Sequence, residues 1–274
     1  MVHFRSEKIS PAVTRIHGVW DEQMYLIEGT KKAALIDTGI GVGSLRKYVE
    51  TITKKPIIVL LTHGHLDHAM GAPEFEEVYM NRKDDYIYNQ HSSITMRKSL
   101  LEEMPIFKDV EEDDYIPVTS CDSFENLKGG AIFDLGDVTI EIYDCVGHTL
   151  GSVVMLLKEE RTLITGDACN SATFLFDDYS TGLKTYEESL RRLDEETRGK
   201  YDRVYLSHRE SDADKDMIIS AIAVCEDIRA GKADNDKQVI MGKIATIAKR
   251  MNTDMHRIDG GSANIFYDLS RVNE

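Results

Sequence analysis

A cluster of three histidines and one aspartate, directly behind a strongly apolar run, constrains this sequence more than any other feature. Residues 57–61 (IIVLL) are typical of a strand that is covered on both faces, and residues 62–68 (THGHLDH) follow at once. Histidine makes up only 9 of 274 residues, so composition alone does not explain this spacing. Imidazole nitrogens and carboxylate oxygens are ligands of zinc and of divalent iron or manganese. The chain must therefore fold so that this strand end opens into a cleft.

Three further potential ligands stand behind other apolar segments. His148 follows the run VTIEIYDCV, Asp167 follows RTLIT, and His208 follows RVYL. Each of them alone is weak support, because a single histidine at a strand end is more often structural. Together with the cluster they supply five histidines and two aspartates, which is too many for one tetrahedral metal and suits two metals that share a bridge.

Apolar periodicity predicts the regular elements around these residues. Leu45 to Ile52 carries apolar residues at helical spacing and links two expected strands. Two more amphipathic helices are expected behind capping-box spacings, Thr185 with Glu188 and Ser211 with Asp214. The expected strands are residues 24–28, 33–37, 57–61, 138–143, 152–157, 163–165 and 204–206.

Strands mixed with helices occur in two halves, residues 24–80 and 132–208, which predicts an α/β (α+β) protein with two sheets and outer helices. No Pro-, Gly- or Ser-rich linker separates the halves, so residues 1–274 are predicted to form a single domain. A helical and loop-like insertion is expected over about 82–130, and a C-terminal extension over about 231–274. That extension ends in a turn and a final strand across residues 260–267.

Charge and hydropathy exclude several classes of protein. With 33 Lys and Arg against 48 Asp and Glu, the net charge is −15, which disfavours nucleic acid and anionic membranes as partners. The longest apolar runs are far below the roughly 20 residues of a membrane span, and MVHFRSEKIS contains no secretory apolar region, so a cytoplasmic protein is expected. Four cysteines without a C-x-x-C pair argue against a disulfide framework or a thiolate zinc site. The expected partner is a small-molecule substrate, and a homo-oligomer is left open.

The ordered set T-H-x-H-x-D-H, G-H-T-x-G-S, G-D and S-H resembles the metallo-β-lactamase superfamily, from about Tyr25 to His208. Residues 35–39 (LIDTG) resemble the early I-D-T-G turn of that family. The resemblance implies a four-layer αββα sandwich with two divalent metal ions at the edge between the sheets; zinc is expected, and iron or manganese are alternatives. It implies these ligands: His63, His65 and His148 for the first metal, Asp67, His68 and His208 for the second, and Asp167 between them.

The same resemblance implies that Asp37 orients the cluster loop, although an aspartate before Thr-Gly is also a common turn residue. Two divalent cations lower the pKa of a bridging water towards neutrality, so a metal-bridging hydroxide is the expected nucleophile. Asp67 is the expected catalytic residue, steering that hydroxide or receiving its proton. We therefore expect a metal-dependent hydrolase of a small ester, thioester, lactone or amide. The alternatives are a phosphodiesterase for a small phosphate ester and a catalytically silent metal-binding sensor or binding protein.

Departures from particular branches of the family narrow these expectations. The presence of Asp167 disfavours hydrolysis of β-lactam antibiotics, because class B β-lactamases generally lack a bridging aspartate. Flavodiiron reductases usually carry Glu where His65 stands, so oxidoreduction is disfavoured. The nuclease branches typically add a long domain or a basic arm, which this acidic chain lacks, so a nuclease is disfavoured as well. Glyoxalase II enzymes share all seven ligands but bind glutathione with a basic, helical C-terminal segment. Residues 209–274 show no such pattern, so hydrolysis of a glutathione thioester stays open without support.

Substrate recognition is expected from the segments between the ligands. Asn170, Ser171, Phe174 and Phe176 could wall the cleft and favour an apolar acyl group, or the two Phe could pack inside the sandwich. Tyr86, Tyr88 and His91 could form a lid or belong to an ordinary amphipathic surface helix. Arg209 could bind a substrate carboxylate or pair with neighbouring acids.

Overall fold

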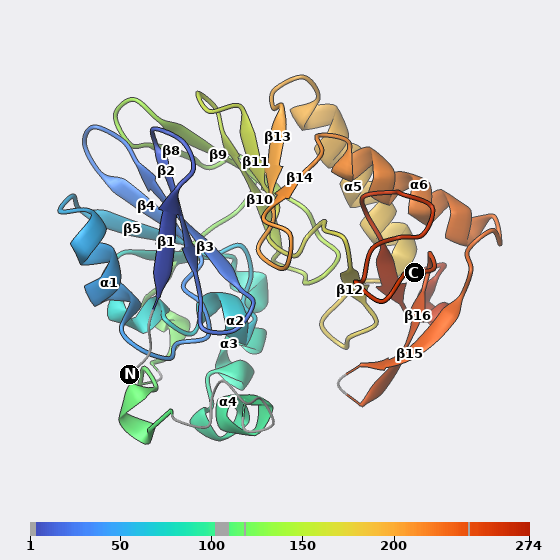
Figure 1. Cartoon of the computed structure of the whole chain (residues 1–274), viewed down its shortest axis with the longest axis horizontal. Coiled ribbons are helices and arrows are strands. Elements are labelled where there is room, and N and C mark those ends of the chain that lie inside the picture. Colours follow the sequence, from blue (N-terminus) through green and yellow to red (C-terminus); the bar gives the residue numbers. More distant parts are fainter. Residues whose placement is uncertain (1–3, 102–109, 118, 241) are drawn as a thin grey trace.

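The computed structural model describes residues 4–101, 110–117, 119–240 and 242–274. Two β-sheets face each other across an apolar layer, and helices cover the outer face of each sheet (Figure 1). The order of layers is therefore helix, sheet, sheet, helix. This confirms the predicted αββα sandwich.

The first sheet has seven strands in chain order. Its first four strands pair antiparallel, and β4, β5, β6 and β7 are parallel neighbours. The strands are β1 (Arg5–Lys8), β2 (Val13–His17), β3 (Gln23–Glu28), β4 (Ala33–Ile36), β5 (Ile57–Leu60), β6 (Val78–Met80) and β7 (Glu125–Asn126). The helices on its side are α1 (Leu45–Ile52), α2 (Leu66–Ala69), α3 (Asp85–His91) and α4 (Ile94–Leu101).

The second sheet has six strands in the order β14-β13-β11-β10-β9-β8. Helices α5 (Leu183–Thr197) and α6 (Met217–Arg229) pack on its outer face. Its strands are β8 (Ile132–Asp134), β9 (Thr139–Asp144), β10 (Val153–Leu157), β11 (Thr162–Ile164), β13 (Arg203–Tyr205) and β14 (Asp212–Ala213). Short 3₁₀ turns complete the chain: η1 (Ala72–Glu74), η2 (Arg82–Asp84), η4 (Glu112–Asp114), η5 (Cys121–Ser123) and η6 (Leu269–Arg271).

A third sheet of four strands was not predicted; its order is β12-β17-β16-β15. Three of its strands belong to the expected C-terminal extension: β15 (Asp236–Ile240), β16 (Lys243–Ile247) and β17 (Ile265–Tyr267). The fourth, β12 (Thr173–Leu175), comes from the loop behind Asp167 and pairs parallel with β17. The expected final strand is thus confirmed, and it joins the extension to a segment that starts next to a predicted ligand.

Burial on both faces explains why the central strands are almost continuously apolar. In β3, Tyr25 and Ile27 point into the layer between the two sheets, whereas Met24 and Leu26 pack beneath the helices of the first sheet. The inter-sheet layer also contains Tyr205, whose ring stacks on that of Tyr25 at a centroid distance of 5.5 Å. Period-2 packing of this kind fixes the register of one sheet against the other.

The two predicted capping boxes are wrong, although both helices exist. Helix α5 begins at Leu183 after an extended Gly182, and the backbone N–H of Thr185 donates to the carbonyl of Glu274 rather than starting the helix. Helix α6 begins at Met217. Ser211 instead precedes β14, and its carbonyl accepts a hydrogen bond from Leu206 N–H. At α5 a tertiary partner thus supplies a hydrogen bond that local capping would otherwise provide, whereas at α6 the N–H of Met217 bonds locally to the carbonyl of Asp214.

The expected insertion over 82–130 contains α3, α4 and short 3₁₀ turns, and it returns to the first sheet as β7. Residues 102–109 and 118 of that segment lie outside the described residues. The partition into one domain with an insertion and an extension stays a prediction. All four cysteines lie in the described part of the chain, where they are buried free thiols. Among the described residues, no helix has the length and apolarity needed to cross a bilayer.

We expect Phe266→Ala to destabilise the whole chain, because this β17 side chain is fully buried and packs against Phe174 at a ring distance of 5.3 Å. The cost should be about 3–5 kcal/mol in the free energy of unfolding, measured by urea titration. Ile244→Ala, at a side chain that is 68% exposed on the same sheet, is the control and should change that energy by less than about 0.5 kcal/mol. Unchanged stability of Phe266→Ala would show that the third sheet does not fold together with the sandwich.

Candidate metal centre

Strand ends deliver all seven predicted ligands to one edge of the sandwich. The loop behind β5 and the first turns of α2 carry His63, His65, Asp67 and His68. In the second sheet, β9, β11 and β13 run in the same direction, since β10 is antiparallel to β9 and β11, and β13 is parallel to β11. The loops that follow these three strands carry His148, Asp167 and His208.

The first group of ligand atoms consists of three imidazole nitrogens. Nε2 of His63 lies 3.1 Å from Nδ1 of His65, and Nε2 of His148 lies 2.9 Å from the same Nδ1. Nitrogens bound to a tetrahedral zinc at 2.0–2.1 Å lie roughly 3.3 Å apart, which is close to this spacing. The donor set and its spacing therefore fit a divalent metal.

The second group combines two imidazoles with a carboxylate. Nε2 of His68 lies 3.1 Å from Nε2 of His208, and Oδ2 of Asp67 lies 3.3 Å from the latter atom. Within this group, as within the first, the candidate ligand atoms all lie within 4.8 Å of one another. Histidine with carboxylate is a donor set that zinc, iron and manganese all accept, so it fits a metal without identifying it.

Asp167 connects the two groups. Its Oδ2 atom lies 3.7 Å from Nε2 of His148 in the first group. The same oxygen lies 3.5 Å from Nε2 of His68 and 3.6 Å from Nε2 of His208 in the second group. One carboxylate oxygen thus faces both groups, and the clusters are consistent with a dinuclear metal site. The assignment of individual ligands stays a prediction.

Buried hydrogen bonds fix the orientation of the imidazoles. Nδ1 of His68 donates to Oδ2 of Asp37 at 2.8 Å, and the Thr62 hydroxyl donates to that oxygen at 2.8 Å while lying 3.1 Å from Nδ1 of His63. Nδ1 of His148 donates to the carbonyl of Phe174 at 3.0 Å. These partners leave Nε2 of each ring free for a metal. Asp37 lies where its predicted orienting role would place it, and that role stays a prediction. Its backbone φ of 60° is in the left-handed region, which is uncommon for residues other than glycine.

Burial and neighbouring charges separate the histidines by pKa. Burial, together with the surrounding imidazoles, lowers the pKa of His63 and of His65 well below the usual value. For His208, burial acts in the same direction, but the carboxylates of Asp167 and Asp67 outweigh it and raise the pKa to about 9. For His68, burial is likewise outweighed by nearby carboxylates, which raise its pKa. Without metal, protons therefore gather in the second group.

Sequence reasoning missed two buried carboxylates beside the centre. Glu22 is 2% exposed, forms a backbone bridge with His208, and accepts a hydrogen bond from Trp20 N–H at 3.0 Å. Burial raises the pKa of Glu22 to about 7. Asp84 is fully buried in the turn before α3. Both stand in polar stretches without apolar periodicity, so no signal in the sequence set them apart.

The residues considered for substrate contact have different positions. Tyr88 is fully buried in the core beneath the first sheet, and Phe176 is buried against the third sheet, so neither lines an open cleft. Tyr86 is 70% exposed, and its ring lies 6.1 Å from that of Tyr179. The ring of Tyr179 lies 5.8 Å from His65 and 5.4 Å from His91. A small aromatic group thus stands beside the first set of ligands.

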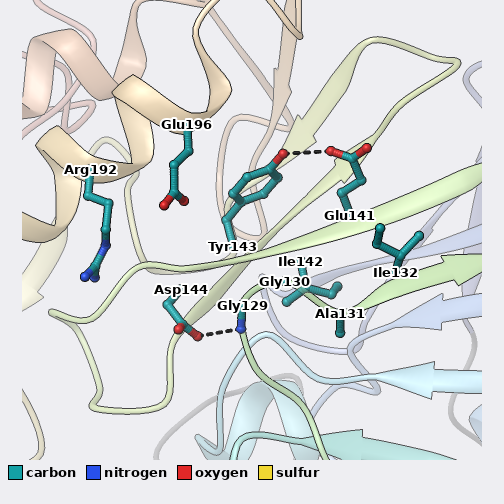
Figure 2. Close-up of a pocket in the computed structure, with 10 residues that line it drawn as sticks. All are labelled: Gly129, Gly130, Ala131, Ile132, Glu141, Ile142, Tyr143, Asp144, Arg192 and Glu196. Atoms are coloured by element: carbon teal, nitrogen blue, oxygen red, sulfur yellow. Dashed lines mark hydrogen bonds between the residues drawn. The ribbon is translucent and has the colours of Figure 1, made fainter.

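A surface hollow of about 530 Å³ lies elsewhere, between β9 and α5 (Figure 2). Figure 2 shows Arg192 and Glu196 on the helix above it, with Tyr143 hydrogen-bonded to Glu141 and Gly129 to Asp144. None of its lining residues is a predicted ligand. We assign the chemistry to the histidine and aspartate groups rather than to this hollow, because no histidine lines it and its carboxylates form none of the candidate metal groups among the described residues.

An αββα sandwich with paired histidine and aspartate groups at one edge defines a class of metal-dependent hydrolases. The sequence profile of the Metallo-beta-lactamase superfamily matches residues 17–208 of this chain. The chain belongs to this superfamily and is a metal-dependent hydrolase of its fold.

Individual relatives are distant. Hydroxyacylglutathione hydrolase GloC of Haemophilus influenzae is 26% identical over 65% of this chain and 79% of its own length. Human acyl-coenzyme A thioesterase MBLAC2 is 23% identical over 53% of this chain and 57% of its own length. The match therefore spans little more than half of the human relative.

Solved structures support the fold alone. A metallo-beta-lactamase from Pontibacter korlensis superposes with a TM-score of 0.57 at 20% identity, covering 81% of this chain and 98% of that one. A stereoselective inverting sec-alkylsulfatase from Pseudomonas gives a TM-score of 0.59 at 17% identity, covering 84% of this chain and 42% of that one.

We expect His148→Ala to lower the metal content of the purified protein, because it removes one nitrogen of the first group. His256→Ala is the matched control, since this histidine pairs with Glu210 on the surface and is not a predicted ligand. Metal content after dialysis, measured by plasma mass spectrometry, should fall by about one ion per chain in the first variant and stay constant in the second. Retention of both metals by His148→Ala would contradict the assignment.

Proton release should distinguish the two groups. His208 has a pKa of about 9 in the metal-free chain, so at pH 7.5 a metal must displace a proton from the second group. His63 and His65, with lowered pKa values, are already neutral at that pH. Calorimetric zinc titration in two buffers of different ionisation enthalpy should show one binding event that releases about one proton or more and one that releases almost none. Equal release in both events would be inconsistent with this charge distribution.

Proposed function

We propose that this chain is a dinuclear metal-dependent hydrolase whose substrate is a small thioester or ester, and that zinc is its metal. The observation that carries the dinuclear centre is the position of Asp167 Oδ2, within 3.5–3.7 Å of ligand nitrogens in both groups. A carboxylate placed in this way would be able to bind both of two adjacent cations.

The thioester is supported by the named activities of the relatives. One is a hydroxyacylglutathione hydrolase, and three others are acyl-coenzyme A thioesterases from different vertebrates. A fungal atrochrysone carboxyl ACP thioesterase, 26% identical over 66% of this chain, has the same reaction in its name. These proteins differ in the thiol that carries the acyl group. The acyl thioester bond is what they share, and we propose it for this chain.

The C-terminal segment bears on which thiol is used. After α6, the chain forms β15, β16 and β17 of the third sheet rather than helices. Within residues 209–274, the described part contains one α-helix, α6, and its sole basic residue is Arg229, so it does not resemble the basic helical segment expected of glyoxalase II enzymes. This favours a thioester or ester whose leaving group is not glutathione.

The two cations, when bound, act as Lewis acids and make hydroxide available at neutral pH. The chain's own residues orient this chemistry and move the proton. Oδ2 of Asp67 lies 3.3 Å from Nε2 of His208, at the second group, and burial is outweighed there by His68 and His208, which lower the pKa of Asp67. An ionised carboxylate at this position can accept the proton of the attacking water and pass it to the leaving group.

The substrate class can be tested with a panel of chromogenic acyl thioesters, esters, lactones and bis(p-nitrophenyl) phosphate. Protein reconstituted separately with zinc, iron(II) or manganese should hydrolyse the thioesters with the highest kcat/KM, and zinc should support the reaction. Preference for the phosphodiester would overturn the proposal in favour of a phosphodiesterase. Two bound metals without turnover of any panel member would favour a binding protein.

Asp67→Asn should lower kcat by about 10²–10⁴-fold at saturating metal, because the amide cannot accept the proton. Asp122→Asn, at an exposed carboxylate in η5, is the control and should leave kcat unchanged. Steady-state kinetics with the best thioester, at metal concentrations that restore full occupancy, separate loss of proton transfer from loss of metal. A kcat within twofold of the wild type would rule out this role for Asp67.

A further inference from the structure

Asp84 is a fully buried carboxylate that none of the predicted ligand groups contains. Its Oδ2 atom accepts hydrogen bonds from the backbone N–H of Gly64 at 3.0 Å and from the hydroxyl of Thr149 at 2.7 Å. Its Oδ1 atom accepts from the backbone N–H of Gly151 at 2.8 Å. The side chain therefore makes three short bonds to two loops that are far apart in the sequence.

Both loops carry ligands of the first group. Gly64 stands between His63 and His65, and Thr149 directly follows His148. One loop extends from the first sheet and the other from the second, so the Asp84 carboxylate joins the two halves of the sandwich behind the first group. The Thr149 hydroxyl also lies 2.8 Å from that of Ser152, and because its hydrogen goes to the carboxylate of Asp84, it accepts from Ser152.

The glycines of both motifs are explained by the close approach of Asp84, through its backbone at Gly64 and through its carboxylate at Gly151. A Cβ at Gly64 would lie 2.9 Å from the backbone oxygen of Asp84, and a Cβ at Gly151 would lie 2.6 Å from its Cγ. Real side chains do not approach so closely, so both loops need glycine in order to close around Asp84. The H-G-H and H-T-L-G-S segments of this chain thus pack closely around Asp84, which belongs to neither segment.

The second group has a different support. His68 is held by Asp37, which also accepts from the backbone N–H of Thr62 at 2.7 Å. None of the three hydrogen-bond partners of Asp84 is next in sequence to a predicted ligand of the second group. Asp37 thus contacts His68 of the second group directly and reaches His63 of the first group through Thr62, whereas the three bonds of Asp84 go only to the loops of the first group.

We propose that Asp84 is the positioning residue of the first metal subsite, holding the loop of His63 and His65 against the loop of His148 so that their nitrogens converge. This inference rests on the dinuclear centre of the proposed function but not on its substrate. Asparagine at this position would turn amide hydrogens towards one or more of three hydrogen-bond donors and loosen the loops. Loss of such an outer partner typically weakens metal binding about 10–100-fold.

The test isolates each subsite and measures zinc affinity by competition with a chromophoric chelator. The His208→Ala background retains the first group, and the His148→Ala background retains the second. Asp84→Asn should weaken zinc binding about 10–100-fold in the first background and less than about twofold in the second. Asp85→Asn is the matched control, because this neighbouring carboxylate pairs with Arg82 and should change neither affinity.

Equal weakening in both backgrounds, or none in either, would overturn the positioning role. Thr149→Val removes one of the three bonds with little change in volume, and it replaces Asp84→Asn if circular dichroism shows that the latter does not fold. The same affinity pattern is expected for it, with a smaller loss. Failure of wild-type protein to bind two zinc ions would count against the dinuclear proposal itself, whereas two ions in the wild type with unchanged variant affinities would count only against Asp84.

Discussion

Contacts between polar side chains from opposite sheets hold the catalytic edge of this molecule together. Nδ1 of His65 and Nε2 of His148 lie 2.9 Å apart, and Oδ2 of Asp167 lies 3.5 Å from Nε2 of His68. Each pair joins the first half of the chain to the second, and neither half contains a complete group. The spacing of the ligands therefore depends on how the two sheets pack. That packing is set by the apolar layer between them, in which Tyr25 stacks on Tyr205.

The buried carboxylates at this edge fall into two kinds. Asp37 and Asp84 are satisfied by hydrogen bonds from the protein, and both hold loops in place. Asp67 and Asp167 face mainly imidazoles at distances of 3.3–3.8 Å. Burying charge is costly unless a counter-charge is present. Two divalent cations would supply that counter-charge. The hydrogen-bond partners therefore distinguish carboxylates that hold loops in place from carboxylates that are available to bind metal.

The sequence predicted the elements with a strong periodic signal. The predicted bounds of the strands around the ligands and of the helix Leu45 to Ile52 agree with the structure to within about two residues. The order of the two halves also agrees. The third sheet was missed because β15 is largely exposed and both β15 and β16 mix polar with apolar residues, which gives no clear strand periodicity. The start of α5 was misplaced because Thr185 N–H donates to the distant carbonyl of Glu274. The start of α6 was misplaced because Ser211 pairs with Leu206 before β14 instead of starting the helix.

By itself, the sequence determined which side chains are candidate metal ligands, in which order they follow the strands, and that their number suits two cations better than one. These are properties of residue type and spacing, which the order of residues along the chain specifies. Only the tertiary structure decided which distant side chains hold those ligands, and Asp84 and Glu22 show why. Hydrogen-bond donors from separate loops converge on Asp84, and burial shifts the pKa of Glu22, but both effects arise from neighbours that the order of residues along the chain does not specify.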